Sequence, residues 1–201
     1  HPAAAWAVRD DLGGMGRYSV VGALRAAAGP PRRWPVPAWV VLVAEAARAG
    51  LDVPPDELAD AVRAYAHMQV GEEPVWVDAG SALVSALPAD FAAAAPAELV
   101  TDLADVAVAL HRAVDLQLLL DLLAPAVEAG HVAATFASAY LLQDGLGDTV
   151  GASFTLGDAA VAARAGGRTE DADALAAGRL ALVRRAGGTY PADEEVALPA
   201  G

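Results

Sequence analysis

The side chains best able to do chemistry stand near the middle of this 201-residue chain, where His111 and Asp115 are four positions apart. On one α-helix this spacing lets the two side chains meet. A histidine oriented by a carboxylate can act as a general base, and the same pair can supply two ligands to a metal ion. His111 and Asp115 are therefore the candidates for catalytic residues, and Arg112 and Tyr140 are candidates for binding a ligand beside them.

A third ligand for a metal ion is difficult to place. About 30 Å of helix rise separates His111 from Gly130, so a helix that returns from His131 starts far from His111. A boundary histidine that takes no part in chemistry is the simpler interpretation of His111. We therefore predict no metal site and no cofactor, and we assign no catalytic residue.

The missing residue types exclude several chemistries. The chain contains no lysine, cysteine, isoleucine or asparagine, and all 13 of its basic residues are arginine. Without lysine there is no Schiff base and no Walker phosphate loop, and without cysteine there is no thiol nucleophile, disulfide or thiolate metal site. None of the serines lies in a Gly-x-Ser-x-Gly turn. The codons for lysine, isoleucine and asparagine are AT-rich, so their absence indicates a GC-rich genome, which we take to be bacterial.

Two helices in the stretch 97–143 must position the candidate residues. Apolar residues recur at helical spacing through its first half, at Leu99, Leu103, Val106, Ala107, Leu110 and Val114. Leucines then surround the helix over 116–123, so we expect that segment to be buried on most sides. Pro125 should end or kink this helix, and Gly130 should stop it. A second helix over 131–143 then gives a helical hairpin at the centre of the fold.

Similar patterns predict helices over 37–49, 56–68, 81–87, 149–165 and 170–186. The segment 75–77 is a short candidate for a strand, but a single strand does not make a sheet. We predict an all-α fold with one helical domain over 1–201, built as a multi-helix bundle or as an irregular helical-hairpin stack. The two ends, 1–16 and 189–201, should be loosely ordered.

Residues 147–152 read Gly-Asp-Thr-Val-Gly-Ala. This segment resembles the Gly-Asp-Thr-Asp-x-x-Ala metal-binding motif of the ADP-ribosylglycohydrolases, which are also all-helical. Val150 stands where that motif has its second aspartate, and the upstream Asp-Asp-Thr partner is missing. Because the position that would hold the metal differs, we interpret Asp148 and Thr149 as a helix cap.

The segment 29–39 contains four prolines, two arginines and two tryptophans. Proline-rich backbone favours an extended conformation. Trp34 and Trp39 are candidates for the rim of a ligand-binding or docking site. We favour the interpretation in which the loop is rigid and its tryptophans cover the core.

Charge limits the partners of this chain. Its formal net charge is -13, and its arginines gather only in short pairs, so it has no basic face for nucleic acid or for an anionic membrane surface. Its apolar runs are shorter than the ~20 residues that span a bilayer, and no secretory signal pattern opens it. We therefore expect a cytoplasmic protein that binds neither nucleic acid nor membranes.

These features favour a non-catalytic helical binding or interaction protein over an enzyme. The partner would be another protein or a second copy, bound through Ala/Leu-rich helix faces. A helix that is apolar all round, as over 116–123, needs either a complete shell from its own chain or such a partner. The alternative is a small-molecule-binding protein or an enzyme whose apolar pocket lies between helices around His111 and Asp115.

Overall fold

The computed structural model describes residues 36–68 and 74–187 of the chain. Every regular element in these ranges is a helix, which confirms the all-α prediction. The elements are α3 (Val36–Arg48), α4 (Pro55–His67), α5 (Pro74–Ala86), α6 (Phe91–Ala94), α7 (Ala97–Leu110), α8 (Leu116–Glu128), α9 (Val132–Tyr140), the π-helical turn η2 (Leu141–Gly145), α10 (Thr149–Ala165) and α11 (Thr169–Arg185). The predictions for 1–16, 189–201 and Trp34 concern residues outside these ranges.

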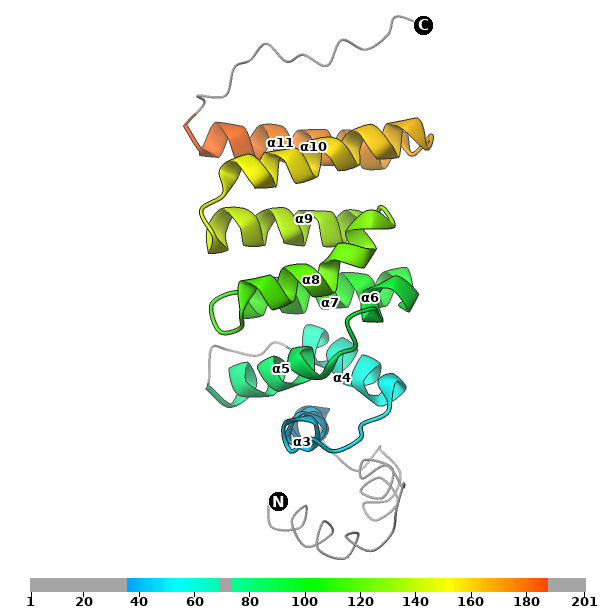
Figure 1. Ribbon diagram of the computed structural model, residues 1–201, viewed down its shortest axis with the longest axis vertical. Coiled ribbons are helices and arrows are strands. Elements are labelled where there is room, and N and C mark those ends of the chain that lie inside the picture. Colours follow the sequence, from blue (N-terminus) through cyan, green and yellow to red (C-terminus); the bar gives the residue numbers. More distant parts are fainter. Residues whose placement is uncertain (1–35, 69–73, 188–201) are drawn as a thin grey trace, which may run out of the picture.

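The helices lie in layers that follow the order of the chain (Figure 1). Helix α3 forms one end of the stack, and the next layers are α4 with α5, then α7 with α8, then α9, and finally α10 with α11. Each helix packs mainly on helices of its own or an adjacent layer. Contacts limited to adjacent units are typical of solenoid proteins. Of the two predicted architectures, the structure adopts the irregular helical-hairpin stack.

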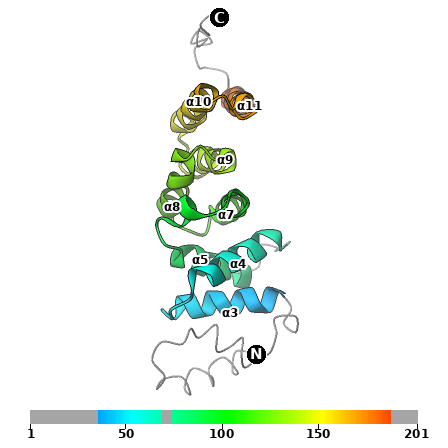
Figure 2. The ribbon, with the colours of Figure 1, turned by 90° about the vertical axis from the view of Figure 1, so that its right-hand side faces the viewer.

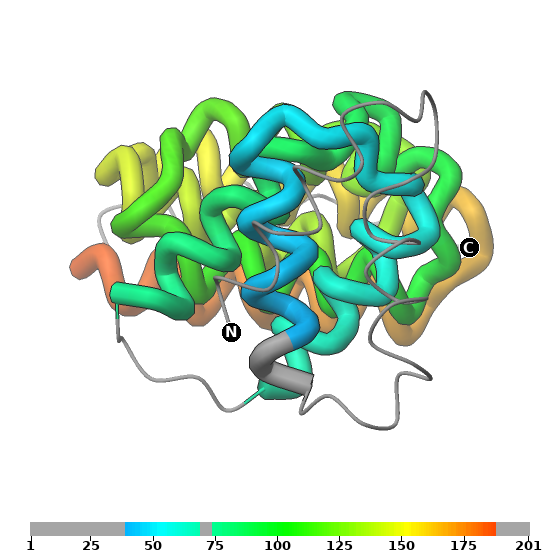
Figure 3. Tube along the Cα trace, turned by 90° about the horizontal axis from the view of Figure 1, so that it is seen from below, coloured from blue at the N-terminus to red at the C-terminus, as the bar shows by residue number. Residues whose placement is uncertain are grey.

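Two columns of helices are visible when the stack is turned (Figure 2). Helices α7, α9 and α11 lie above one another on one side, and α8 and α10 lie on the other. From α7 to α11 successive helices run in opposite directions, so α7, α9 and α11 all run the same way (Figure 1). Helix α3 is seen end-on in Figure 1 and side-on in Figure 2, and it crosses the layers above it when the stack is viewed from below (Figure 3).

The buried side chains are mostly small or medium-sized, as a composition with only 5% aromatic residues requires. They form one large cluster that extends from α3 to η2 and a smaller one that joins α9, α10 and α11. Alanines such as Ala126 and Ala134 are fully covered, which lets neighbouring helix backbones approach closely. The smaller cluster depends on three leucines, Leu156, Leu175 and Leu182.

The leucine-rich segment of α8 is enclosed by its own chain. Three of its leucines are buried and three are partly buried against the same cluster: Leu119, Leu122 and Leu123, then Leu116, Leu118 and Leu120. Within 116–123 only Gln117 and Asp121 are exposed, and the Gln117 side-chain amide donates to the Asp121 carboxylate at 2.8 Å. The neighbouring helices therefore cover the apolar segment 116–123, and this segment needs no partner to cover it.

The central hairpin differs from the predicted one. The helix that begins at Ala97 ends at Leu110, and residues 111–115 form a turn. Asp115 then caps α8, since its carboxylate accepts a hydrogen bond from the Gln117 backbone amide at 3.0 Å. The hairpin is α7 with α8, and α9 packs on both. The helical spacing of apolar residues continues through this turn, so the sequence pattern does not reveal it. The only local signal is that aspartate is a preferred cap residue.

Pro125 does not end the helix that contains it, because α8 continues to Glu128. A proline lacks one amide hydrogen and so removes one helical hydrogen bond, while the Ala129 amide still donates to the Pro125 carbonyl at 3.0 Å. The helix stops as predicted at Gly130, whose φ of 80° suits glycine. The Arg168 guanidinium donates to the Gly130 carbonyl at 2.7 Å, which ties the α8–α9 connection to the α10–α11 turn.

Other helix boundaries confirm some sequence signals and contradict others. Asp148 caps α10 as predicted, and its carboxylate accepts from the Gly151 amide at 2.8 Å. Helix α11 begins at Thr169, with Arg168 as its cap residue, one position before the predicted start at residue 170. The suggested strand at 75–77 is wrong, because these residues lie in α5, which begins at Pro74. Proline at a first helical position loses no hydrogen bond, and this start signal outweighs the two β-branched valines.

Tyr65 anchors α4 on α5. Its hydroxyl donates to the Trp76 carbonyl oxygen at 3.0 Å, and the residue is only 4% exposed. Gly80 lies against the ring, since a Cβ at that position would stand 2.7 Å from the ring carbon that bears the hydroxyl. Burial disfavours the charged phenolate and raises the pKa of Tyr65 above its ordinary value of 10.0.

We expect the free energy of unfolding to fall through Tyr65 at alkaline pH. The unfolded chain loses this proton near pH ~10, whereas the folded chain keeps it to higher pH, so the stabilisation is complete below ~10 and is lost above it. Tyr65→Phe should cost about 1 kcal/mol at neutral pH by removing the bond to Trp76, and less as the pH rises. Urea unfolding of both proteins from about pH 8 to about pH 11 measures the difference. A difference that stays constant over this range would contradict the prediction.

Candidate functional site

A groove of about 500 Å³ follows α9 between α7 and α11. Helix α9 contributes Ala133, Phe136, Ala137 and Tyr140 to its lining. Their spacing places all four on one stripe of the helix. The floor of the groove is therefore a continuous face of α9 that carries two aromatic rings among alanines.

The two walls continue the same kind of surface. Helix α11 contributes Gly178, Ala181, Leu182 and Arg185, again at the spacing of one helical stripe, and α7 contributes Val108 beside two shorter residues. Half of the lining residues are glycine, alanine or valine, so the two aromatic rings are the largest apolar side chains in the groove. The result is an apolar trough formed by three parallel helices.

The two aromatic rings of the floor are each held by a neighbour. Phe136 is 36% exposed, and its ring rests on Gly178, where any Cβ would overlap with the ring. The Tyr140 ring meets the His111 ring edge-on, with centroids 5.3 Å apart and an angle of 83° between the planes. Both rings are thus fixed before anything binds, which lowers the conformational entropy lost on binding.

Two charged side chains line the groove on opposite walls. Asp105 belongs to α7 and Arg185 to α11, and both are exposed. Neither forms an ion pair within residues 36–68 and 74–187. The groove therefore combines an apolar floor with one negative and one positive group at its edges.

The predicted His111–Asp115 pair does not lie on one helix. The His111 ring takes both of its hydrogen bonds elsewhere: Nδ1 lies 2.7 Å from the Val108 carbonyl oxygen, and Nε2 accepts from the Arg112 Nε at 3.3 Å. Asp115 is occupied as the cap of α8. The expected orientation of His111 by Asp115 across one helical turn was wrong, because the turn at 111–115 interrupts the helix.

Among the other predicted residues, Tyr140 lines the groove and Arg112 only approaches it through His111. Trp39 lies in α3, where it is partly buried against the core. Trp34 is outside the described part of the chain. A role for these residues in binding a ligand stays a prediction, and only Tyr140 has a place in the groove.

Sequence reasoning missed Phe136, Gly178 and Arg185. The available signal was the stripe spacing, which recurs over 133–140 and 178–185. Both stripes consist largely of alanine, which suits a helix interior and an exposed face equally well. Nothing in the sequence alone indicated that these two stripes would lie side by side.

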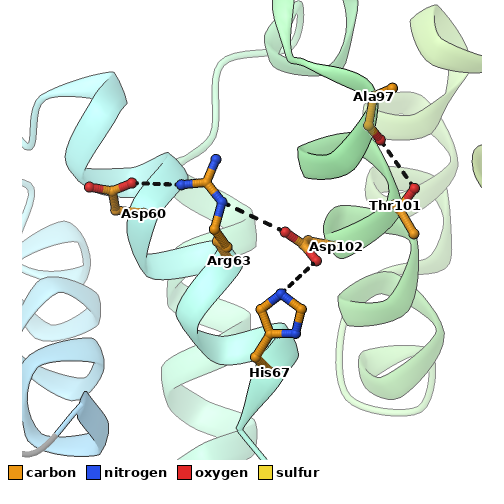
Figure 4. Close-up of polar contacts among 6 residues, drawn as sticks. All are labelled: Asp60, Arg63, His67, Ala97, Thr101 and Asp102. Carbon is orange, nitrogen blue, oxygen red and sulfur yellow. Dashed lines mark hydrogen bonds and ion pairs between the residues drawn. The ribbon is translucent and has the colours of Figure 1, made fainter.

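A carboxylate is buried between α4 and α7 (Figure 4). The Asp102 side chain is 10% exposed, with His67 Nε2 at 3.3 Å from one oxygen and Arg63 Nε at 3.9 Å from the other. Arg63 also pairs with Asp60 at 2.9 Å. His67 and Arg63 are largely exposed and cover the carboxylate from the solvent side. This cluster joins two adjacent layers of the stack.

An aspartate beside a histidine is also the arrangement of a general base. The Thr101 hydroxyl, which appears in the same view, donates to the Ala97 carbonyl oxygen of its own helix at 3.1 Å. It is therefore not offered to His67 as a nucleophile. We interpret the cluster around Asp102 as a contact that stabilises the α4–α7 interface.

We expect Asp102→Asn to lower the free energy of unfolding by about 1 kcal/mol, because the buried carboxylate loses its charge-assisted contacts with His67 and Arg63. Asp105→Asn is the matched control, since Asp105 is exposed on the same helix and forms no ion pair in the described chain. Its effect should stay within about 0.5 kcal/mol. Urea unfolding at neutral pH compares the two, and equal effects would show that the buried contacts contribute nothing.

A second cavity, of about 580 Å³, lies between α3 and α5. Arg48 lines it together with Ser81 and Ser85. The Arg48 guanidinium already pairs with Glu45 at 2.6 Å and donates to the Asp78 carbonyl oxygen at 2.9 Å. Because the Arg48 guanidinium already has partners within the chain, this cavity provides no unpaired positive charge for a ligand, whereas the groove along α9 does.

Across 36–68 and 74–187, no three His, Asp or Glu side chains come together as a metal site requires. No helix in those ranges is both long and apolar enough to cross a membrane. No family model, curated protein or solved structure matches the chain. The function is therefore inferred from the geometry of the groove.

Proposed function

We propose that this chain is a non-catalytic interaction protein that binds a segment of another protein in the groove along α9. The observation that carries the proposal is a pair of aromatic rings, exposed Phe136 and partly buried Tyr140, each packed against a neighbouring element on an apolar floor between two helical walls. Rigid aromatic side chains in apolar surroundings supply most of the binding energy at many protein interfaces.

The length of the groove favours a protein segment over a small molecule. Its floor extends from Ala133 to Gln143, which is about 15 Å of helix. Three helices contribute to it in parallel, so a bound segment can contact all of them at once. Helical-hairpin stacks commonly present such extended surfaces to their partners.

A small-molecule-binding protein or an enzyme is the second candidate function. The contact between His111 and Tyr140 favours it, because it places an imidazole next to the groove. Against it stands the engagement of both His111 ring nitrogens by Val108 and Arg112. A free nitrogen is what acid–base chemistry or ligation would require.

Site-specific photo-crosslinking tests the proposal. The photoreactive residue p-benzoylphenylalanine replaces Ala181, which is exposed in the groove, or Ala162, which is exposed on α10 outside it. After irradiation in cells of the source organism, we expect one covalent protein adduct from the Ala181 variant and none from the Ala162 variant. Adding Phe136→Glu to the Ala181 variant should reduce the adduct by about fivefold or more.

The alternatives give different results in the same experiment. An adduct composed of two copies of this chain would indicate self-association instead of a separate partner. Absence of any protein adduct, together with a small molecule that copurifies with the native protein and is lost on Phe136→Glu, would favour the second candidate function.

A further inference from the structure

We infer that the segment bound in the groove is an amphipathic α-helix with a basic and an acidic residue on opposite flanks, about nine residues apart. This inference rests on the proposed function and specifies the chemistry of its partner. It follows from the two unpaired charges of the groove and from their positions along α9.

The groove carries two charged side chains that no ion pair engages, as is also true of Arg112, Arg179 and Arg184 elsewhere in the described chain. Four arginines elsewhere lie within 4.0 Å of an acidic side chain: Arg48, Arg63, Arg164 and Arg168. Arg185 has no such neighbour in the described chain, although it lines the groove, and Asp105 on the opposite wall has none either. A partner with complementary charges would pair with both while its apolar face covers the floor.

Two contacts show how α7 and α11 are aligned with α9 along the length of the groove. His111, at the end of α7, lies against Tyr140 of α9. Gly178 of α11 lies against Phe136 of α9. Phe136 and Tyr140 are four residues apart, so these two contact levels differ by about 6 Å along the groove.

The positions of the two charges follow from the same helical rise. Asp105 precedes His111 by about 9 Å, and Arg185 follows Gly178 by about 10 Å. When these two rises are combined with the offset of about 6 Å between the contact levels, Asp105 and Arg185 come to lie roughly 13 Å apart along the groove. They belong to opposite walls. This distance equals about nine residues of a bound helix.

A helix meets this pattern in a way that an extended strand does not. Nine steps along a helix turn it by about 900°, which places residue i+9 on the opposite flank from residue i. Reversing the direction of the bound helix exchanges its two flank positions, so a given order of the basic and acidic residues satisfies both charges in one direction only.

Three fluorescein-labelled helical peptides test the inference against the full chain by fluorescence anisotropy. They share one leucine stripe and differ only at two flank positions nine residues apart, which are Lys and Glu, Lys and Lys, or Glu and Glu. The unmodified chain should bind the Lys/Glu peptide about fivefold more tightly than either of the others. Asp105→Arg should shift the preference to the Glu/Glu peptide, and Arg185→Glu should shift it to the Lys/Lys peptide.

Matched substitutions control for overall charge. Asp158→Arg on α10 and Arg184→Glu beside the groove change the net charge equally, but neither residue lines the groove, so the order of the three peptides should stay unchanged. Equal affinity for the three peptides, or a preference that follows net charge in the controls, would overturn the inference.

The failure of the inference differs from the failure of the proposed function. If no peptide binds while the Ala181 variant still gives its protein adduct, the partner is not a helix of this kind, and the proposed function stands. If light scattering shows a dimer that Phe136→Glu dissociates, the occupant is a second copy, and both the inference and the separate partner are wrong.

Discussion

Replacing Leu123 with alanine should lower the free energy of unfolding by about 3 kcal/mol. Leu123 is fully buried in the large cluster, in the segment of α8 where leucines surround the helix. The truncation removes apolar contacts and leaves a cavity, because the layers above and below are held by their own packing. Urea or thermal unfolding of the variant measures the loss.

Leu118→Ala is the matched control in the same helix. Leu118 is only partly buried at the margin of the cluster, so its truncation should cost about 1 kcal/mol, since solvent and neighbouring side chains can occupy the space. Similar losses at the two positions would show that the stack closes around cavities, and would contradict a close-packed core around α8.

The helix boundaries could be predicted from the sequence where a capping residue or a terminating glycine marks the end of a helix. The span of α10 was predicted to the residue, because Asp148 caps its start and glycines follow its end. The stop at Gly130 was predicted for the same reason. The turn after Leu110 was missed because apolar spacing runs on without glycine or proline, and the capping role of Asp115 appears only once the helix is known to be broken.

The candidate site could be predicted less well from the sequence, because it depends on which helices become neighbours in the fold. Sequence distance suggested His111 with Asp115, whereas the fold places His111 against Tyr140, 29 positions further along the chain. Phe136 and Gly178 meet across an even longer separation. Because alanine occurs on both buried and exposed helix faces, an alanine-rich stripe does not show which face another helix will cover. Local patterns therefore predicted the helices but could not predict the groove.

Gly80→Ala should lower the free energy of unfolding by about 2 kcal/mol, although alanine favours a helix interior by about 1 kcal/mol over glycine. A Cβ at this position would stand 2.7 Å from two atoms of Tyr65 and 2.9 Å from a methyl group of Leu110. Both neighbours are buried, and the Tyr65 hydroxyl is held by Trp76 at 3.0 Å. The ring can move only by breaking that bond or by displacing α4 from α5.

Two comparisons separate this overlap from a general effect of the substitution. In a Tyr65→Leu background the two tyrosine atoms are gone and only the Leu110 methyl group stays close, so the effect of Gly80→Ala should shrink to within about 1 kcal/mol of zero. Gly157→Ala in α10 faces the end of the flexible Arg179 side chain, and its cost should stay within about 1 kcal/mol. If Gly80→Ala destabilises both backgrounds equally, the contact with Tyr65 is not its cause, because additive effects mean that the two positions do not interact.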